Sequence, residues 1–251
     1  MRVLGIIPAR GGSKGVPRKN LYPLAGTPLI AYSITSAQQA HSLDRFIVST
    51  DDPEIASVAR AYGAEVPFMR PAALAQDDTP DLPVFQHCLW WLGEHERYRP
   101  DMIVHLRPTQ PLRRPSDIDA VVRLLRGTGA DSVKSVRLVK EHPHKMWRIE
   151  NGQLVPYLQT EFRLRVGPDY PRQQLESLYV SSAVVDAVWT RVIEEGSTTG
   201  NTVIPYLTDP MLSITLDSLH DFVRAELVIR TLDLGRTDSV EPPPLHDLRR
   251  A

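Results

Sequence analysis

A short segment near the N-terminus combines glycines with basic residues directly after an apolar run. The run is Val3 to Ile7, and the segment that follows it is PARGGSKGVPRKN, Pro8 to Asn20. Glycines let the backbone approach a ligand with exposed N–H groups, and they adopt conformations that other residues resist. The cations among them can neutralise anionic oxygens: Arg10, Lys14, Arg18 and Lys19. The pattern indicates a site for a polyphosphate, and a solvated basic turn after a first strand is the alternative.

The spacing within this loop excludes two common phosphate-binding motifs. The P-loop motif G-x-x-x-x-G-K-[ST] needs a hydroxyl residue after its lysine, but Gly15 follows Lys14. The glycines also fail to match G-x-G-x-x-G, the fingerprint of dinucleotide-binding dehydrogenases. The loop therefore favours neither a kinase-type ATP site nor a dehydrogenase.

Three further polar or basic segments follow predicted strands and are candidates for the same site. They are Ser49–Asp52, Arg70 and Arg107–Arg114. Open α/β sheets bind ligands at the carboxyl ends of their strands, so in a parallel sheet these segments share one crevice with the first loop. Such a cluster of cations suits a triphosphate or an acidic acceptor. Taken singly, Arg70 or Arg113 is typical of a surface arginine.

The other residues with catalytic or metal-binding potential do not form a recognisable second site. Cys88 is the single cysteine and lies beside Leu89-Trp90-Trp91, so we expect it in the core rather than as a nucleophile. His142 and His144 would share one face of a strand, but the sequence shows no third ligand nearby. We expect Trp90 and Trp91 on a helix face, in the core and on a subunit surface.

Length and composition are those of a globular chain with one large domain. The chain has 251 residues, of which 42% are hydrophobic and 24% charged, and no apolar stretch approaches the roughly 20 residues of a membrane helix. The formal net charge of −1 provides no general attraction for nucleic acid. No secretory signal precedes the first predicted strand, so we expect a cytoplasmic protein that binds neither nucleic acid nor a membrane.

The elements that must position these loops alternate between strands and helices, which indicates an α/β fold with a largely parallel sheet. Predicted strands occupy Val3–Ile7, Phe46–Val48, Glu65–Phe68, Met102–Leu106, Asp131–Val136, Val180–Val185 and Val203–Leu207. Apolar residues at helical spacing predict helices around 30–40, 52–62, 82–92, 116–125 and 218–232. Asp52, followed by Pro53, marks the start of the second helix, and Gly63 marks its end.

Composition divides the chain into three parts. We expect the α/β domain in residues 1–141 and 179–233. It is interrupted at 142–178 by an insertion with short strand-like pieces and an Asn151-Gly152 hairpin turn. Residues 234–251 contain the run Glu241-Pro242-Pro243-Pro244 and several arginines, and we expect a flexible tail there.

Six motifs in one order resemble those of the acylneuraminate cytidylyltransferases. The first is Pro8-Ala9-Arg10-Gly11-Gly12-Ser13-Lys14-Gly15 with Lys19-Asn20. The others are Ser49-Thr50-Asp51, Arg70-Pro71-Ala72 with Leu74-Ala75, Arg107-Pro108-Thr109-Gln110-Pro111-Leu112-Arg113, His142-Pro143 with Lys145, and Pro171-Arg172-Gln173-Gln174. The resemblance covers the chain from about Val3 to Ile229, and six ordered motifs are far more specific than one.

This resemblance implies a Rossmann-like nucleotidyltransferase fold of the GT-A-like type. Such a fold has a mostly parallel sheet with helices on both faces, and here a small arm, 142–178, through which two subunits pair. The resemblance also implies a reaction in which a hydroxyl of an acidic sugar attacks the α-phosphorus of CTP, and pyrophosphate leaves with the assistance of Mg²⁺. Nucleotidyl transfer depends mostly on positioning and charge stabilisation, which suits the many cations in the motifs.

The same resemblance implies a role for each matching residue. The residues that would bind the nucleotide are Arg10, Gly11, Gly12, Ser13, Lys14, Asn20 and Arg70. Lys19 would neutralise charge at the transferred phosphorus and Asp217 would hold magnesium, so these two residues and Arg10 are the catalytic candidates. The residues that would bind the acceptor are Arg107, Thr109, Gln110, Arg113, Lys145 and Arg172, of which the last two lie on the arm and would reach the partner subunit's site.

Three positions depart from the family's pattern. Thr215-Leu216-Asp217 stands in place of the usual D-x-D, which leaves one carboxylate where two usually serve magnesium, a metal that needs few protein carboxylates. Asp217, just ahead of Ser218, is alternatively a helix N-terminal acid. Ser181-Ser182 replaces an Asn-Gly, and Arg107 stands where many relatives have Gln.

These departures leave the substrates open. Other acceptors for the same chemistry are Kdo-like ulosonic acids, the bacterial legionaminic and pseudaminic acids, or a phosphonate, and GTP is an alternative to CTP. A protein that binds nucleotides but has lost catalysis is the alternative from another functional class.

Overall fold

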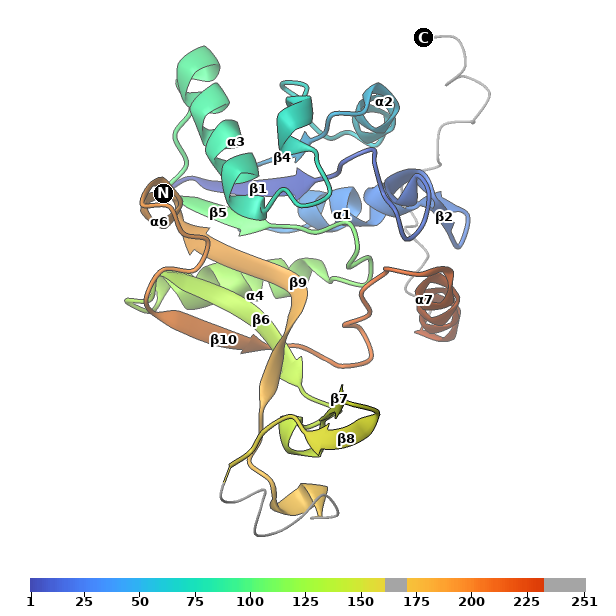
Figure 1. Ribbon diagram of the computed structural model, residues 1–251. Helices are drawn as coiled ribbons and strands as arrows, with labels where there is room; N and C mark the ends of the chain where they lie inside the picture. The colour runs from blue at the N-terminus through green and yellow to red at the C-terminus, as the bar shows by residue number, and fades with distance from the viewer. Residues whose placement is uncertain (161–170, 233–251) are drawn as a thin grey trace.

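The structure, a computed structural model, describes residues 1–160 and 171–232 (Figure 1). Within these residues, six strands form a sheet in the order β10-β6-β9-β5-β1-β4. Their bounds are β1 Val3–Pro8, β4 Arg45–Ser49, β5 Met102–His105, β6 Ser132–Leu138, β9 Tyr179–Trp189 and β10 Val203–Leu207. The middle of the predicted arm, 161–170, and the predicted tail, 234–251, lie outside the described residues.

The sheet is mostly parallel. β1 pairs in parallel with β4 and β5, and β10 pairs in parallel with β6. β9 lies between β5 and β6 and is antiparallel to both, so it runs against the other described strands of the sheet. The predicted α/β fold is confirmed. The direction of β9 was not predicted, and this strand continues to Trp189, past its predicted end at Val185.

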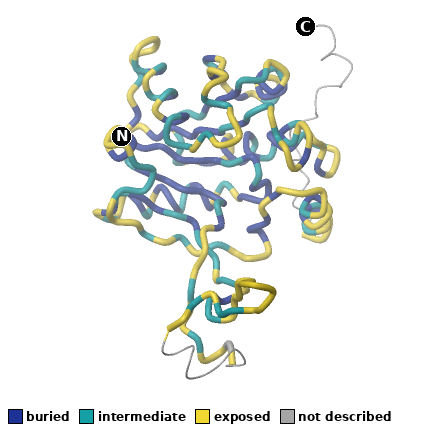
Figure 2. The backbone as a smooth tube through the Cα atoms, in the orientation of Figure 1, coloured by how far each residue is buried: buried dark blue, intermediate teal, exposed yellow. Residues whose placement is uncertain are grey.

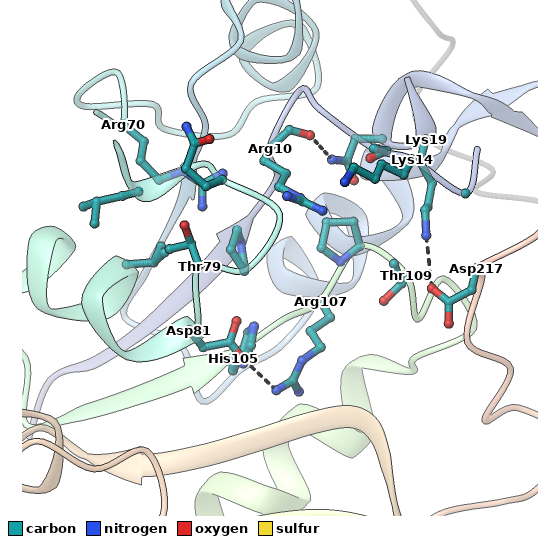
Figure 3. Close-up of a pocket in the computed structure, with 18 residues that line it drawn as sticks. Arg10, Lys14, Lys19, Arg70, Thr79, Asp81, His105, Arg107, Thr109 and Asp217 are labelled. Carbon is teal, nitrogen blue, oxygen red and sulfur yellow. Dashed lines mark hydrogen bonds and ion pairs between the residues drawn. The ribbon is translucent and has the colours of Figure 1, made fainter. Parts of the chain in front are cut away.

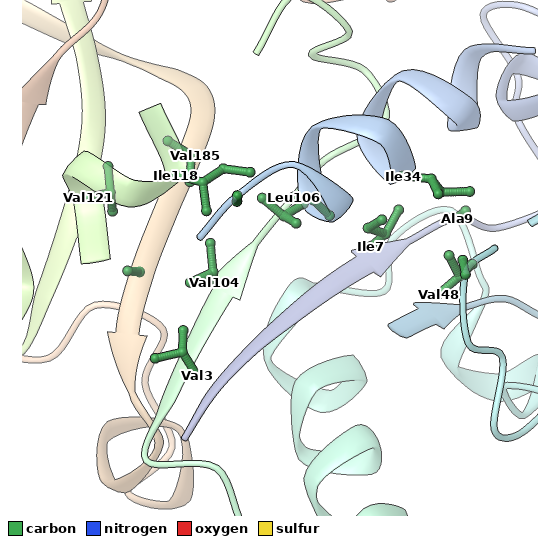
Figure 4. Packing of buried hydrophobic residues seen from close by; sticks show 14 of the residues in the cluster. Val3, Ile7, Ala9, Ile34, Val48, Val104, Leu106, Ile118, Val121 and Val185 are labelled. Carbon is green, nitrogen blue, oxygen red and sulfur yellow. The ribbon is translucent and has the colours of Figure 1, made fainter. Parts of the chain in front are cut away.

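Helices cover both faces of the sheet because successive side chains of a strand point to opposite sides. On β1, Val3 and Ile7 join one apolar cluster with α1 (Leu29–Gln38), α2 (Pro53–Ala61) and α4 (Pro115–Arg126) (Figure 4). Leu4 and Ile6 join a second cluster with α3 (Asp81–Glu96) and α6 (Thr190–Glu194). No helix in the described parts of the chain has the length and apolar character needed to cross a membrane.

Two helix starts illustrate how local sequence sets the elements. Asp52 caps α2, since its Oδ1 accepts the N–H groups of Glu54 at 2.8 Å and of Ile55 at 3.2 Å. α4 begins at Pro115, one residue before the predicted Ser116, because Oδ2 of Asp117 accepts the N–H of Arg114 at 2.9 Å.

The predicted strand at Glu65–Phe68 is wrong. The segment runs beside β4 but makes only isolated parallel bridges, Ile47 with Glu65 and Thr50 with Met69. Pro67 lies between these two bridges and has no N–H to donate, so a continuous ladder cannot form. Backbone bonds on either side, such as the N–H of Arg70 to the carbonyl of Thr50 at 2.7 Å, still fix the path of the chain.

A third apolar cluster holds the glycine loop against the C-terminal helix α7 (Leu219–Leu232). Val16 of the loop and Leu216, both fully buried, pack in it with Phe222 and Ile229 of α7. Short elements continue the loop toward α1: η1 (Lys19–Leu21), β2 (Pro23–Leu24) and β3 (Thr27–Pro28). This packing brings together two segments that lie about 200 residues apart in the sequence.

The chain between β6 and β9 projects from the sheet as an arm with a largely exposed surface (Figures 1 and 2). Its described elements are η3 (Pro143–Lys145), β7 (Trp147–Glu150), β8 (Gln153–Pro156) and η4 (Arg172–Gln174). β7 and β8 form an antiparallel hairpin, and its turn residues Asn151 and Gly152 have φ of 51° and 77°. The predicted hairpin turn is confirmed.

Candidate active site

A cavity of about 510 Å³ opens at the carboxyl ends of β1 and β5 (Figure 3). Four segments line it: part of 8–20 after β1, part of 70–84, 105–109 after β5, and Asp217. Figure 3 shows Arg70, Thr79 and Asp81 on one side and Lys19 with Asp217 on the other. The predicted convergence of basic segments on one crevice is confirmed for these segments.

The glycine loop is held against the end of β4 by Asp51 and lies close to Asp52. The N–H of Gly11 donates to Oδ1 of Asp51 at 3.0 Å, and a Cβ on Gly11 would lie 2.7 Å from Oδ2 of Asp52. Nδ2 of the buried Asn20 donates to the carbonyl of Arg10 at 2.9 Å, which ties the two ends of the loop together. The glycine at position 11 is therefore required by a close approach to Asp52.

Arg10 and Lys14, the two cations of the loop that enter the cavity with Lys19, share one carboxylate. Nη1 of Arg10 lies 2.7 Å from Oδ1 of Asp77, and Nζ of Lys14 contacts Oδ2 of the same residue. The hydrogen bond from Lys14, together with the Arg10 guanidinium, lowers the pKa of Asp77 below its ordinary value. An anionic group of the protein thus occupies the cations that were predicted to hold a triphosphate.

Lys19 and Asp217 form an ion pair on the opposite side of the cavity. Nζ of Lys19 donates to the carbonyl of Leu216 at 2.8 Å and to Oδ1 of Asp217 at 3.1 Å. The Lys19 side chain is 12% exposed, whereas the Asp217 side chain is 74% exposed. The backbone N–H of Leu216 also donates to the carbonyl of Thr109 at 2.9 Å. A partly buried cation with a fixed position thus meets a carboxylate that is open to solvent and to ligands.

Arg70 lines the cavity and has two buried hydrogen-bond donors without a partner among the described residues. Its side chain is only 4% exposed, and its Nη2 lies 3.7 Å from Oδ1 of Asp51. Nε and Nη2 find no hydrogen-bond partner in the described residues. Burial lowers the pKa of Arg70, and the nearby Asp51 only partly offsets this effect. A ligand oxygen would satisfy these buried donors only after a movement of the side chains that cover them.

Arg107 is held between two carboxylates. Its Nη1 donates to Oδ2 of Asp186 at 2.9 Å, and its Nη2 donates to Oδ2 of Asp81 at 3.1 Å. Asp186 lies on β9, and its Oδ1 accepts the backbone N–H of Ser135 at 3.0 Å. The positive charge that Arg107 adds to the cavity is therefore compensated by the protein itself.

His105, at the end of β5, is an uncharged member of the same wall. The residue is 4% exposed and its Nε2 has no partner among the residues that the structure describes. Burial, together with Arg107, Arg113 and Lys134, lowers its pKa well below the ordinary value. Asp81 lies 3.6 Å from Nδ1, too far for a hydrogen bond that would offset this effect.

The other predicted site residues lie in several environments. Ser13 and Thr109 line the cavity, whereas Gly11 and Gly12 belong to the loop without lining it. Gln110 and Arg113 are buried behind the wall: Nε2 of Gln110 donates to Thr215 at 2.6 Å and to the carbonyl of Ser182 at 2.8 Å.

Arg113 makes three hydrogen bonds within the domain, including one from Nη2 to the carbonyl of Arg107 at 2.7 Å. Burial, with Arg107 nearby, lowers the pKa of Arg113 to about 9.

The two predicted acceptor-binding residues of the arm lie elsewhere in the fold. Lys145 is exposed in η3, and Arg172 lies in η4 with its side chain outside the described part of the structure.

Sequence reasoning missed four residues that line the cavity or pair with its cations: Asp77, Asp81, His105 and Asp186. Two of them carried a usable signal, because a histidine that ends an apolar strand and an aspartate inside the run Val184 to Val188 are both unusual. Asp77 and Asp81 stand in a polar segment and carried none, since only the fold places that segment beside the glycine loop.

The donor set fits a magnesium ion that is held largely by a substrate. The described residues contain no group of three or more His, Cys, Asp or Glu side chains arranged for a metal. Asp217 offers an exposed carboxylate beside the cations. Magnesium keeps several waters and is commonly bound by one or two carboxylates together with phosphate oxygens. Asp217 would hold the ion in this way, and the ion would supply positive charge to the phosphate oxygens.

The sequence of this chain is similar to those of known proteins over most of its length. The chain matches the cytidylyltransferase family over residues 4–155. It is 33% identical over 229 residues to a CMP-N,N'-diacetyllegionaminic acid synthase of Legionella pneumophila, which covers 90% of this chain and 95% of the relative. It is 36% identical over 150 residues to N-acylneuraminate cytidylyltransferase A of Danio rerio, covering 60% of this chain and 33% of that protein.

A solved structure has a similar fold. CMP:2-keto-3-deoxy-manno-octonic acid synthetase complexed with CTP superimposes with a TM-score of 0.65 at 17% identity, over 92% of this chain and 100% of the other. The predicted nucleotidyltransferase fold is confirmed.

Replacing Gly15 tests the contact between the glycine loop and the segment before α7. A Cβ at Gly15 would overlap the carbonyl oxygen of Asp217, so Gly15→Ala must push the two segments apart. We expect unfolding in urea to show a loss of about 1–3 kcal/mol, and calorimetry to show weaker binding of inorganic tripolyphosphate. Gly129→Ala is the matched control because nothing lies within 4 Å of a Cβ there. Equal effects of the two substitutions would contradict this account of the loop.

His105 makes stability depend on pH in a defined direction. Because the pKa of His105 is lowered in the folded state, below pH ~6.5 the imidazole takes up a proton in the unfolded chain but not in the folded protein. The free energy of unfolding therefore decreases as the pH falls below that value. The slope from this one group approaches about 1.4 kcal/mol per pH unit. We expect His105→Gln to lose stability less steeply than the wild type between about pH 6.5 and 5 in urea titrations. Parallel curves for the two proteins would show that His105 titrates normally.

Proposed function

Because the chain belongs to the acylneuraminate cytidylyltransferase family, we propose that it transfers CMP from CTP to an acidic sugar and releases pyrophosphate. The observation that carries this proposal is the cavity in which the glycine loop, Arg70 and the Lys19–Asp217 pair meet. Its cations come from separate segments and match the distributed charge of a triphosphate.

The chemistry assigns a task to each side of the cavity. Arg10 and Lys14 bind anionic oxygens of the triphosphate, with the unpaired donors of Arg70 as further partners. A hydroxyl oxygen of the acceptor forms a bond to the α-phosphorus while the bond to the bridging oxygen of the β-phosphate breaks. Lys19 stabilises the negative charge that develops at the transferred phosphorus, because its ammonium group is already held in place by Leu216 and Asp217.

Mg²⁺ is part of the proposal as the cofactor, with Asp217 as its protein ligand. When bound, it supplies positive charge to the triphosphate oxygens and to the leaving pyrophosphate. Asp217 supports this assignment because its second oxygen, Oδ2, is not engaged by Lys19, which contacts Oδ1.

The acceptor is an acid of the sialic acid type, and legionaminic acid is a leading candidate because of the Legionella relative. Arg107 does not by itself indicate an additional acidic group on the acceptor, since Asp81 and Asp186 already compensate its charge. Pseudaminic acid, Kdo-like ulosonic acids and phosphonates remain candidates for the same chemistry, with GTP as the alternative donor. We place the reaction in the cytoplasm, which stays a prediction.

We also propose that the enzyme is a homodimer in which the arm of one subunit reaches the cavity of the other. The hairpin of the arm exposes large apolar side chains, with Ile149 76% and Leu154 64% exposed. Large apolar side chains that are this exposed on a two-stranded hairpin favour burial against a second copy of the chain. Lys145 and Arg172 would then bring cations to the partner subunit's acceptor, whose carboxylate Arg107 is not free to bind.

Pyrophosphate release with CTP, magnesium and a panel of acidic sugars tests the enzymatic proposal. We expect release with at least one acid. Lys19→Ala should lower kcat by about 10²–10³-fold with little change in the Kd of CTP, while Arg10→Ala should raise that Kd about tenfold. Arg18→Ala is the control, because this neighbouring cation is exposed and contacts Glu54 outside the cavity. CTP binding without release for any acid would instead identify a nucleotide-binding protein.

Complementation between inactive variants tests the arm. In a dimer assembled from Lys19→Ala and Lys145→Ala chains, one cavity receives both native lysines if the arm acts in trans. Random pairing should then restore about a quarter of wild-type activity, because half of the dimers are mixed and each has one intact site. A mixture of Lys19→Ala with Arg10→Ala should be no more active than the average of the two variants measured separately, because both substitutions lie in the same cavity. No recovery in the first mixture would show that the arm does not complete the partner subunit's site.

A further inference from the structure

Asp77 ties together two segments that line the cavity. It lies in the loop between η2 (Ala72–Leu74) and α3, and its neighbours Gln76 and Thr79 line the cavity. The N–H of Thr79 donates to the carbonyl of Gln76 at 3.3 Å, so Asp77 is part of a turn. From this turn its carboxylate reaches both Arg10 and Lys14 of the glycine loop.

A triphosphate on Arg10 and Lys14 must contend with this carboxylate. Each cation has further N–H donors, so phosphate oxygens can approach while Asp77 remains close. Two anions that share the same cations in this way repel each other. Without another cation between them, this repulsion weakens the binding of the triphosphate.

A divalent cation bound between the Asp77 carboxylate and the triphosphate replaces their repulsion by the attraction of both to the metal. Magnesium takes oxygen ligands from carboxylates and from phosphates at the same time. The other position at which the family places a carboxylate, 215, is a threonine whose hydroxyl accepts a hydrogen bond from Gln110 at 2.6 Å. Position 215 thus offers no carboxylate. Asp77, in contact with Arg10 and Lys14, is a carboxylate other than Asp217 that lies beside the predicted triphosphate cations.

We propose that Asp77 makes triphosphate binding depend on magnesium: it opposes the metal-free triphosphate and supports the magnesium complex as a second carboxylate. The inference rests on the proposed function, because it assumes that the glycine loop binds phosphates. In the free protein Asp77 compensates the charges of Arg10 and Lys14 and joins the two segments. With the ligand present, its carboxylate faces the metal-bearing phosphates.

Calorimetry with inorganic tripolyphosphate and with CTP, each with and without magnesium, tests this role. Asp77→Asn keeps the shape and removes the charge. Without magnesium, we expect this variant to bind tripolyphosphate about three- to tenfold more tightly than the wild type. With saturating magnesium we expect it to bind at least about threefold more weakly, so the enhancement by magnesium falls about tenfold or more. CTP should follow the same pattern.

Asp78→Asn is the matched control, because it removes the same charge from the adjacent exposed residue. It should keep the wild-type enhancement by magnesium. An unchanged enhancement in Asp77→Asn, or the same change in both variants, overturns the inference and leaves the proposed function standing. If the wild type binds neither tripolyphosphate nor CTP, the inference and the proposed function both fail.

Discussion

Mutual repulsion among cations in one cavity is the constraint around which the site is organised. The protein meets it by placing a carboxylate from another segment against most of these cations. Asp77 contacts Arg10 and Lys14, Asp217 contacts Lys19, and Arg107 lies between Asp81 and Asp186. Arg70 has a more distant carboxylate, Asp51, which only partly offsets the lowering of its pKa by burial. An anionic ligand relieves the same repulsion, which is why the site suits a triphosphate.

Apolar packing determines where these charges stand. Val16 and Leu216 are buried in one cluster with α7, and this contact brings the glycine loop to the Leu216-Asp217 segment. Lys19 then needs only a short reach to the carbonyl of Leu216. Gly15 permits the approach because the carbonyl of Asp217 occupies the space of a side chain. The position of the catalytic candidates is thus a result of hydrophobic burial, with the ion pair added on top of it.

Two of the departures from the family's pattern meet at one side chain. Nε2 of the buried Gln110 donates to the hydroxyl of Thr215 and to the carbonyl of Ser182. The hydroxyl at position 215 therefore has a structural partner, so the missing carboxylate is not simply an empty position. The third departure, Arg107, is compensated by two aspartates. These contacts show that all three positions are held by hydrogen bonds or ion pairs within the domain, and they give no sign of a collapsed site.

The sequence alone determined the α/β class, the ends of most predicted helices and strands to within about two residues, and the glycine loop as the candidate phosphate site. Each of these depends on local patterns: apolar periodicity, Asp52 before Pro53 as a helix start, and glycines among cations after a strand. Pro67 was a local signal against the strand predicted at Glu65–Phe68, because proline has no N–H for a ladder, but the strand character of Val66 and Phe68 outweighed it.

Only the tertiary structure decided which charges pair. It placed Asp77 on Arg10 and Lys14, turned Gln110 and Arg113 into the interior, and compensated Arg107 with a carboxylate from the antiparallel strand β9. The physical reason is that electrostatic partners are chosen by distance in space. That distance is set by how the sheet and the third apolar cluster pack, and not by spacing along the chain.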